Sequence, residues 1–191
     1  MQVSAQAMVA LTETRSNGVQ VGVPDAATNR ESQMLRTLAL TAAALTGVTA
    51  VVYLNFSARV MPALAKLPNP AGIARMQQFN RTAVQPPFMI CFFGAAVLGG
   101  YLIVRVARGE RGTADLLAAA GGAAYLAGFL LTIGYHVPLN NRVDALTPSD
   151  PAAVGVWRDH LTNWTRANTL RAVLSILGAG ALIGAALAPP R

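Results

Sequence analysis

Residues 135–171 concentrate the side chains that are able to do chemistry. This stretch, YHVPLNNRVDALTPSDPAAVGVWRDHLTNWTRANTLR, holds both histidines and both tryptophans of the chain, together with adjacent asparagines and several arginines. An imidazole has an unperturbed pKa of about 6.5, which suits proton abstraction at neutral pH, while guanidinium and amide groups stabilise an anion that forms beside them. A loop that only joins two helices does not need this set, so we expect a polar site here.

The two histidines, His136 and His160, have two competing interpretations. A metal site needs three or four protein ligands, and no cysteine or well-placed carboxylate accompanies the histidines, because Asp159 adjoins His160 and points to a different helical face. A general base needs only one imidazole. We therefore predict a site with no bound metal, in which His136, close to Asn140, is the base.

A second group of residues forms a helical stripe. Trp157, Trp164 and Arg171 recur every seven residues, and His160 and Asn168 fill the same face. Tryptophans at a membrane boundary commonly anchor a helix among the lipid headgroups. Arg171 falls in the first turn of an apolar run, where burying a cation is costly unless it snorkels or is paired. The stripe therefore indicates either interfacial anchoring or a face that binds an anion such as an enolate or phenolate.

A third group lies in the loop before the second apolar run. A helix is predicted from Ala71 towards Val84, after prolines that break the preceding chain. Gln77, Asn80 and Arg81 share one face of that helix. These side chains either meet water on an interfacial helix or point into a cavity between the spans.

Pro138 is expected to end the helix before it, because a proline disfavours helical geometry in the residue that precedes it. His136, Asn140 and Asn141 would then lie at the mouth of the site. A later helix is predicted from about Pro151 into the last apolar run.

Apolar helices must position these groups. The chain is 53% hydrophobic and 12% charged, against about 25% charged in an ordinary soluble domain. Each apolar run approaches the roughly 20 residues that an α-helix needs to cross a bilayer. The predicted spans are 38–56, 87–107, 114–135 and 170–188. We predict an all-α integral membrane four-helix bundle over residues 34–191, with an additional interfacial helix in each of the two long loops, after a disordered tail over residues 1–33.

The net charge of +7 comes from basic residues scattered at helix ends rather than clustered on one face. This pattern is typical of helices whose flanks meet the anionic headgroups of a lipid bilayer, and it argues against a nucleic-acid partner. The lone Cys91 excludes an intramolecular disulfide. Arginines in the short link 105–114 favour a cytoplasmic side for that link and for both termini, so we expect a multi-pass protein of the bacterial inner membrane.

Small residues four apart occur in three of the runs, at Ala95 and Gly99, Ala124 and Gly128, and Gly180 and Gly184. Such pairs let helix backbones approach closely within lipid. They are expected to serve packing inside the bundle, and the same motifs are equally able to join copies of the chain into a homo-oligomer.

Three sequence blocks resemble the anthrone oxygenase-like family of integral membrane proteins. They are residues 60–88 (VMPALAKLPNPAGIARMQQFNRTAVQPPF), residues 137–146 (VPLNNRVDAL), and the series Trp157, Trp164-Thr165-Arg166, Asn168 and Arg171. With the four runs, the likeness covers about residues 38–188. The chain departs from the family pattern at His136, where asparagine is usual, and at Thr169, where histidine is frequent.

The resemblance implies a cofactor-independent monooxygenase that converts a lipophilic anthrone to an anthraquinone with O₂, without a bound metal or flavin. In that interpretation His136 removes a benzylic proton, while Arg171, Asn140 and Asn168 stabilise the resulting enolate. The residues predicted to bind the substrate are Gln77, Asn80, Arg81, Asn141, Trp157, His160, Trp164, Arg166 and Asn168.

Other functions fit the same composition. A membrane protein without enzymatic activity would use the site to bind a lipid, a quinone-like ligand or a partner protein. A transporter is less well supported, because the spans carry few charges and show no broken-helix repeat. Oxygen consumption with an anthrone or a related hydroquinone separates an enzyme from a binding protein.

Overall fold

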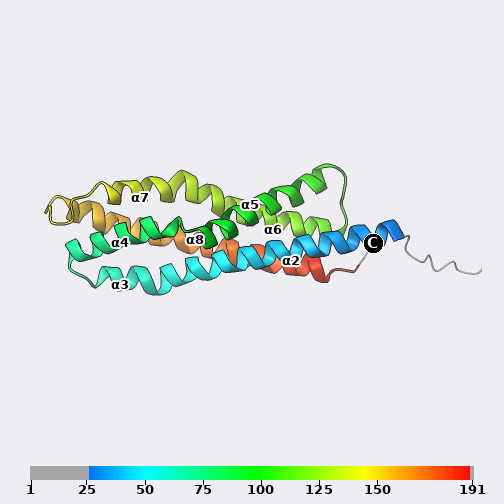
Figure 1. Cartoon of the computed structure of the whole chain (residues 1–191), viewed down its shortest axis with the longest axis horizontal. Coiled ribbons are helices and arrows are strands. Elements are labelled where there is room, and N and C mark those ends of the chain that lie inside the picture. Colours follow the sequence, from blue (N-terminus) through cyan, green and yellow to red (C-terminus); the bar gives the residue numbers. More distant parts are fainter. Residues whose placement is uncertain (1–25, 190–191) are drawn as a thin grey trace, which may run out of the picture.

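Long helices that run roughly along one axis make up the structure, a computed structural model that describes residues 26–189 (Figure 1). All regular elements in this range are helical. The long helices are α2 (Ala26–Asn55), α5 (Pro86–Ala107), α6 (Thr113–Leu131) and α8 (Ala153–Leu187). The short elements are η1 (Phe56–Val60), α3 (Met61–Ala65), α4 (Asn69–Ala83), η2 (Thr132–His136) and α7 (Val137–Asp144), where η marks a π-helical segment.

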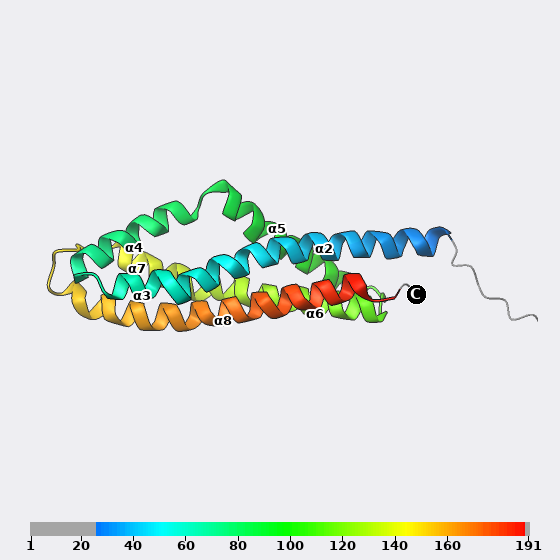
Figure 2. The ribbon, with the colours of Figure 1, turned by 90° about the horizontal axis from the view of Figure 1, so that it is seen from below.

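The described chain contains four helices that are long and apolar enough to cross a membrane, namely Ala26–Ala65, Pro86–Ala107, Thr113–Asp144 and Ala153–Leu187. Each predicted span lies on one of them, so the prediction of four long apolar helices is confirmed. The α3–α4 turn and the α7–α8 loop lie at one end of the molecule, whereas the α5–α6 link lies at the other (Figures 1 and 2). This arrangement indicates a multi-pass membrane protein.

The helices extend beyond the predicted spans. α2 begins at Ala26, inside the segment predicted as a disordered tail, and helix continues through η1 and α3 to Ala65. The rest of that predicted tail, residues 1–25, lies outside the described residues. Of the two predicted loop helices, α4 is a separate helix, and the helix predicted from about Pro151 is the first part of α8, which runs into the last apolar run as expected. The segment between the last two predicted spans also contains α7, which continues from α6 through η2.

The prediction that Pro138 ends a helix is wrong. The chain stays helical from α6 through η2 into α7, and Pro138 occupies the first turn of α7. A proline is tolerated there because the π-helical turn resets the hydrogen-bond register, with the Val137 N–H donating to the Thr132 carbonyl. Asn140 and Asn141 therefore project from a helix rather than from a loop.

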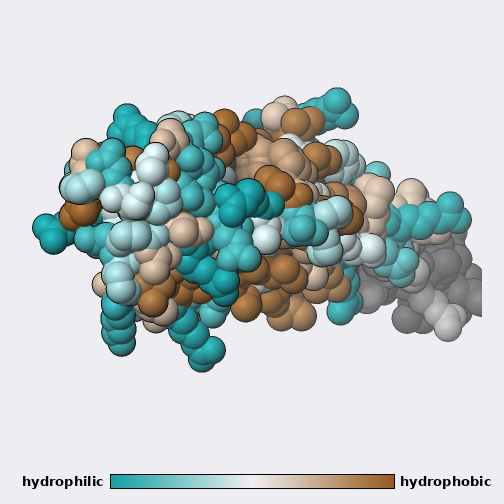
Figure 3. Space-filling view, turned by 60° about the vertical axis from the view of Figure 1, so that its left-hand side comes forward, coloured by the Kyte–Doolittle hydropathy of each residue, from teal (hydrophilic) through white to brown (hydrophobic). Residues whose placement is uncertain are grey.

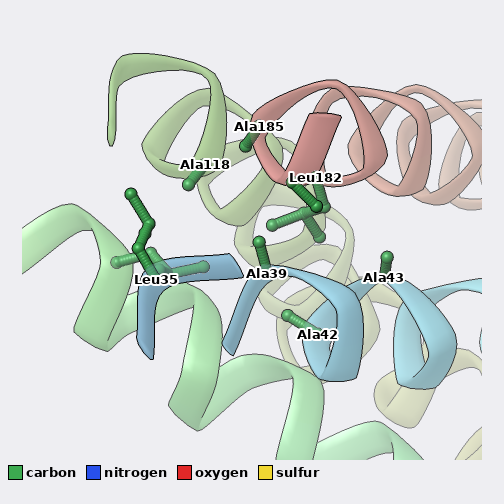
Figure 4. Close-up of a cluster of buried hydrophobic side chains, with 9 residues drawn as sticks. Leu35, Ala39, Ala42, Ala43, Ala118, Leu182 and Ala185 are labelled. Atoms are coloured by element: carbon green, nitrogen blue, oxygen red, sulfur yellow. The ribbon is translucent and has the colours of Figure 1, made fainter. Parts of the chain in front are cut away.

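Two apolar clusters of different character fill the bundle. Towards the α5–α6 link, α2, α6 and α8 meet through small side chains around Leu35 and Leu182, most of them alanines (Figure 4). Short side chains allow helices to pack closely where lipid removes the hydrophobic incentive for association. At the opposite end, bulky side chains, among them Met61, Ile73 and Trp157, join α3, α4 and α8.

Glycines set the closest helix contacts. A Cβ added at Gly122 of α6 would lie 2.6 Å from the Gly99 carbonyl oxygen of α5, and one added at Gly121 would lie 2.8 Å from the Gly178 carbonyl oxygen of α8. These adjacent glycines of α6 thus each contact a different neighbour. Of the predicted small-residue motifs, the one with Gly99 takes part in such a contact, whereas a Cβ at Gly180 would meet no atom within 4 Å.

Gly122→Ala should lower the free energy of unfolding by about 1–3 kcal/mol, because the added methyl group overlaps the α5 backbone and no side-chain rotation relieves the overlap. Gly100→Ala is the matched control, since a Cβ there meets nothing within 4 Å. The control should instead gain up to roughly 1 kcal/mol from the higher helix propensity of alanine. Thermal unfolding in detergent measures both variants, and equal unfolding temperatures would contradict the close approach.

Candidate functional site

A cavity of about 480 Å³ lies where α2, α4, α5, η2, α7 and α8 come together. Its volume falls in the range of small-molecule sites. Most of its lining side chains are apolar or aromatic, and the polar ones converge mainly from η2, α7 and α8. The predicted site residues that line it are Asn80, His136, Asn140, Asn141, Trp164, Asn168 and Arg171.

The π-helical segments η1 and η2 border the cavity and rearrange the backbone around it. In each segment an N–H donates to the carbonyl five residues earlier, from Met61 to Phe56 and from Val137 to Thr132. A π-helical turn shifts the phase of a helix, and such turns are frequent at functional sites. Phe56 and Thr132 both line the cavity.

Arg171 brings a guanidinium group into the buried wall of the cavity, where it is 5% exposed. Its Nη1 donates to Thr132 Oγ1 at 2.9 Å, and its Nη2 donates to Asn168 Oδ1 at 2.6 Å. The guanidinium carbon lies 4.3 Å from the centroid of the Tyr53 ring and 5.6 Å from that of the Trp164 ring. The faces of these rings therefore help to stabilise the positive charge.

Arg105 shows how the chain treats another arginine at the end of an apolar helix. Its guanidinium donates to Asp115 Oδ1 at 3.3 Å through Nε and at 3.1 Å through Nη2, and Asp115 is 1% exposed. Such an ion pair avoids the cost of an isolated buried charge. Within residues 26–189 Arg171 has no carboxylate partner of this kind. Its charge is therefore available to an anion inside the cavity.

Asn168 holds Arg171 and has no amide hydrogen left for a ligand. Its Nδ2 donates to the Tyr53 carbonyl and to Ser57 Oγ, both at 2.7 Å, while its Oδ1 accepts the bond from Arg171. Because an amide NH₂ carries two hydrogens, both are engaged. Asn168 thus positions the guanidinium, which is a different role from the direct contact with an enolate that the sequence suggested.

His136 presents an unpaired ring nitrogen in the same wall. Its Nδ1 lies 3.3 Å from the Leu131 carbonyl oxygen, and because a carbonyl only accepts, the neutral ring carries its proton on Nδ1. Nε2 is then an acceptor, and it is buried without a partner among the described residues. The ring stands edge-on to Trp164, with the centroids 5.3 Å apart. A general base needs an acceptor nitrogen of this kind.

Trp164 sets the orientation of Asn140. The indole Nε1 donates to Asn140 Oδ1 at 2.8 Å, and because an indole nitrogen only donates, the amide oxygen must face it. This orientation leaves the amide hydrogens of Asn140 for a ligand in the cavity. At the outer edge of the cavity, Asn80 Nδ2 donates to Asp144 Oδ1 at 2.9 Å and ties α4 to α7.

The remaining predicted site residues lie outside the cavity lining. Gln77 donates to two backbone carbonyls, in and just after α7, at 3.0 and 2.9 Å. Trp157 belongs to the cluster of bulky residues, where its ring stacks on His160 with centroids 5.7 Å apart. Arg81 and Arg166 are exposed. Only part of each helical face predicted from the sequence, on α4 and on α8, therefore lines the cavity.

Sequence reasoning missed Tyr53, Ser57 and Thr132, which hold the guanidinium or its amide partner. All three are ordinary residues in or beside apolar runs, and the π-helical turns that contain Ser57 and Thr132 leave no compositional signal. The aromatic-rich segment FMICFF, residues 88–93, could have indicated the apolar wall of the cavity from the sequence alone.

Thr169, where the resemblance leads one to expect histidine, does not line the cavity. Its side chain is exposed, and its hydroxyl lies within hydrogen-bond distance of Ser57 Oγ, at 3.0 Å, and of the Thr165 carbonyl, at 2.9 Å. Having threonine instead of histidine at this position therefore affects the outer surface of α8 and removes no side chain from the cavity wall.

Possible metal ligands do not cluster in the part of the chain that the structure describes. Within the described range, no three side chains of histidine, cysteine, aspartate or glutamate are grouped so that they could hold a metal ion. The two histidines do not share one site, since only His136 lines the cavity. Chemistry without a metal or another cofactor stays a prediction.

The profile of a protein family described as anthrone oxygenase matches residues 76–181 of the chain. No curated protein and no solved structure matches it. The matched range begins in α4 and ends in α8, so it contains all the residues of η2, α7 and α8 that line the cavity. It covers more than half of the 191 residues and confirms the resemblance drawn from the three sequence blocks. The chain belongs to the anthrone oxygenase family.

Proposed function

We propose that the chain oxygenates a lipophilic aromatic substrate of the anthrone or hydroquinone type through an enolate, without a bound metal. The observation that carries the proposal is the buried guanidinium of Arg171, which has no carboxylate partner among the described residues and lines a largely apolar cavity. A planar ring system suits apolar walls. Its oxygen atom, where negative charge collects after deprotonation, suits a guanidinium.

The first step is removal of a proton from the methylene carbon of the substrate. His136 Nε2 accepts the proton, the C–H electron pair moves into the ring system, and the negative charge collects on the substrate oxygen. Arg171 stabilises this oxygen electrostatically, and the amide of Asn140 donates to it. Both groups are oriented in advance, by Asn168 and Trp164, so little reorganisation accompanies the development of charge.

Dioxygen then reacts with the electron-rich carbon of the enolate. Electron transfer to O₂ followed by recombination forms a carbon–oxygen bond, and the resulting peroxide takes back the proton from His136. Loss of the second methylene hydrogen as a proton breaks the O–O bond, leaves a carbonyl group and releases water. The four electrons that reduce O₂ come from the methylene carbon, so no further reductant is required. The protein contributes charge stabilisation and the exclusion of water.

A membrane protein that binds such a ligand without enzymatic activity is the second candidate. An apolar cavity that ends in a guanidinium also suits the carbonyl group of a quinone or the headgroup of a lipid. This alternative uses Arg171 but gives the unpaired Nε2 of His136 no task. The two candidates therefore differ in what the loss of His136 should do.

His136→Ala should lower the rate of oxygen consumption with anthrone by about 10²–10⁴-fold, because the proton acceptor is lost. Binding of anthraquinone should be retained. His160→Ala is the matched control, since it also removes a buried imidazole but one outside the cavity lining, and it should cost much less. An oxygen electrode and product absorption measure the rate in lipid vesicles. Undiminished uptake in His136→Ala would exclude this base, and anthraquinone binding with no uptake by the wild type would favour a binding protein.

Arg171→Lys keeps a positive charge but loses the planar fork that bonds Thr132 and Asn168. Without oxygen, the wild type should hold bound anthrone partly as its coloured enolate, and the variant should hold much less. With oxygen, the variant should be slower by about 10²–10³-fold. Arg166→Lys, an exposed position outside the lining, serves as the control. If absorption spectra show the same enolate fraction in all three proteins, Arg171 only anchors the helix end.

A further inference from the structure

The cavity reaches the surface of the molecule beside the bend between α4 and α5. Val84, Phe93 and Ile133 line the cavity and are also 68%, 51% and 51% exposed. Val137 lines it as well and is 44% exposed. Side chains that line a cavity while remaining this exposed stand at its mouth. These four apolar residues form the rim of a lateral opening between the α4–α5 bend and the η2–α7 segment. The exposed lining residues Asn141 and Asp144 stand at a separate, polar edge of the cavity on α7.

Hydrogen bonds tie α4 to α7 on the side of the cavity that faces the α7–α8 loop. Asn80 Nδ2 donates to Asp144 Oδ1 at 2.9 Å. Gln77 Nε2 donates to the carbonyls of Val143 and Leu146 at 3.0 and 2.9 Å. These bonds fasten α4 to α7 and to the chain just after it. At this polar end α4 and α7 are therefore held together by hydrogen bonds, which restrict entry from water, whereas the rim of the lateral opening carries no such bonds.

The lateral opening arises because α5 diverges from the other helices. Deep in the bundle, α5 packs against α6 at Gly99 and Gly122, and Phe92 stacks on Phe129 with ring centroids 4.7 Å apart. Towards Pro86 the helix leaves its neighbours, and the α4–α5 bend stands away from the rest of the molecule (Figure 2). The mouth is thus a consequence of the backbone path rather than of one missing side chain.

The rim is apolar and adjoins an apolar surface. In Figure 3 hydrophilic residues gather over the end of the molecule that carries the loops, and hydrophobic residues form a band behind it. Ile90 of α5 and Leu130 of α6 are 67% and 65% exposed. Exposed apolar surface on helices long enough to span a membrane is suited to contact with lipid. The apolar rim of the opening is therefore suited to contact with hydrocarbon.

We propose that this opening is a lateral portal, through which a polycyclic aromatic molecule dissolved in the bilayer passes directly into the cavity. The chemical class of that molecule rests on the proposed function. An apolar ring that left the bilayer for water would lose about 25 cal/mol for each Å² of apolar surface that became hydrated. A route lined by apolar side chains removes this cost, and the oxygen of the ring system meets the guanidinium of Arg171 inside the cavity.

Narrowing the portal tests the proposal. The double variant Val84→Phe/Ile133→Phe adds a ring at two side chains that are more than half exposed, so the fold should tolerate the change. The probe is 1-aminoanthracene, a fluorescent tricyclic amine that partitions into lipid vesicles containing the full chain. Its association and dissociation should both slow by about tenfold, equivalent to a barrier about 1.4 kcal/mol higher, with little change in affinity.

The matched control is Ile90→Phe/Leu130→Phe, which adds the same rings at 67% and 65% exposed positions outside the cavity lining and should bind at the wild-type rate. Asn80→Ala examines the competing route from water, because it removes the bond to Asp144 that latches the polar end. Faster association in Asn80→Ala, combined with wild-type rates in the narrowed portal, would overturn the proposal.

A lipid acyl chain is the other occupant to test. Lipids brominated on their acyl chains quench a tryptophan that they touch, and Trp164 lines the cavity. Quenching that 1-aminoanthracene does not relieve would show that the opening holds a lipid chain, which would also overturn the proposal.

The binding rates of 1-aminoanthracene involve no oxygen chemistry, so the portal and the proposed function can fail separately. A working portal without oxygen uptake from anthrone would refute the proposed function alone, whereas oxygen uptake with unaltered rates in the narrowed variant would refute the portal alone.

Discussion

A cation buried without a carboxylate partner in residues 26–189 is the constraint on which the site depends. Arg171 is surrounded by neutral groups, namely the hydroxyl of Thr132, the amide of Asn168 and the rings of Tyr53 and Trp164. Each of these lowers the cost of burial without cancelling the charge. The cavity therefore keeps a positive potential in the wall that Arg171 lines. The ion-paired Arg105 near the α5–α6 link differs, because its charge is already matched.

This neutral cage requires irregular helices. In a regular α-helix each interior carbonyl bonds the N–H four residues later, and a side chain competes poorly for it. The π-helical segments η1 and η2 change that pairing, and they bring Ser57 and Thr132 towards α8. Hydrophobic periodicity carries no record of a single wide turn, which is why the sequence suggested that Pro138 ends a helix and gave no hint of Ser57.

The helices and part of the site were predictable because membrane length and the 3.6-residue period leave strong signals. The stripe from Trp157 to Arg171 shows where such signals stop. At 1.5 Å per residue it covers about 21 Å of helix, which is longer than the site. Trp164 and Arg171 reach the cavity, whereas Trp157 packs into the bulky cluster. Periodicity identifies the buried face of a helix. Only the packing of the other helices determines which residues along that face line the cavity.

The adjacent glycines of α6 divide the molecule into halves that tolerate change differently. Around Gly121 and Gly122, backbone lies on backbone, so no larger residue fits and this half is held to one shape. The cavity half is walled by Phe79, Phe88, Met89 and similar side chains, whose volumes can be exchanged against one another at modest cost. Substitutions in the cavity wall can therefore change the size of the molecule that the cavity accepts without disturbing the glycine-packed half.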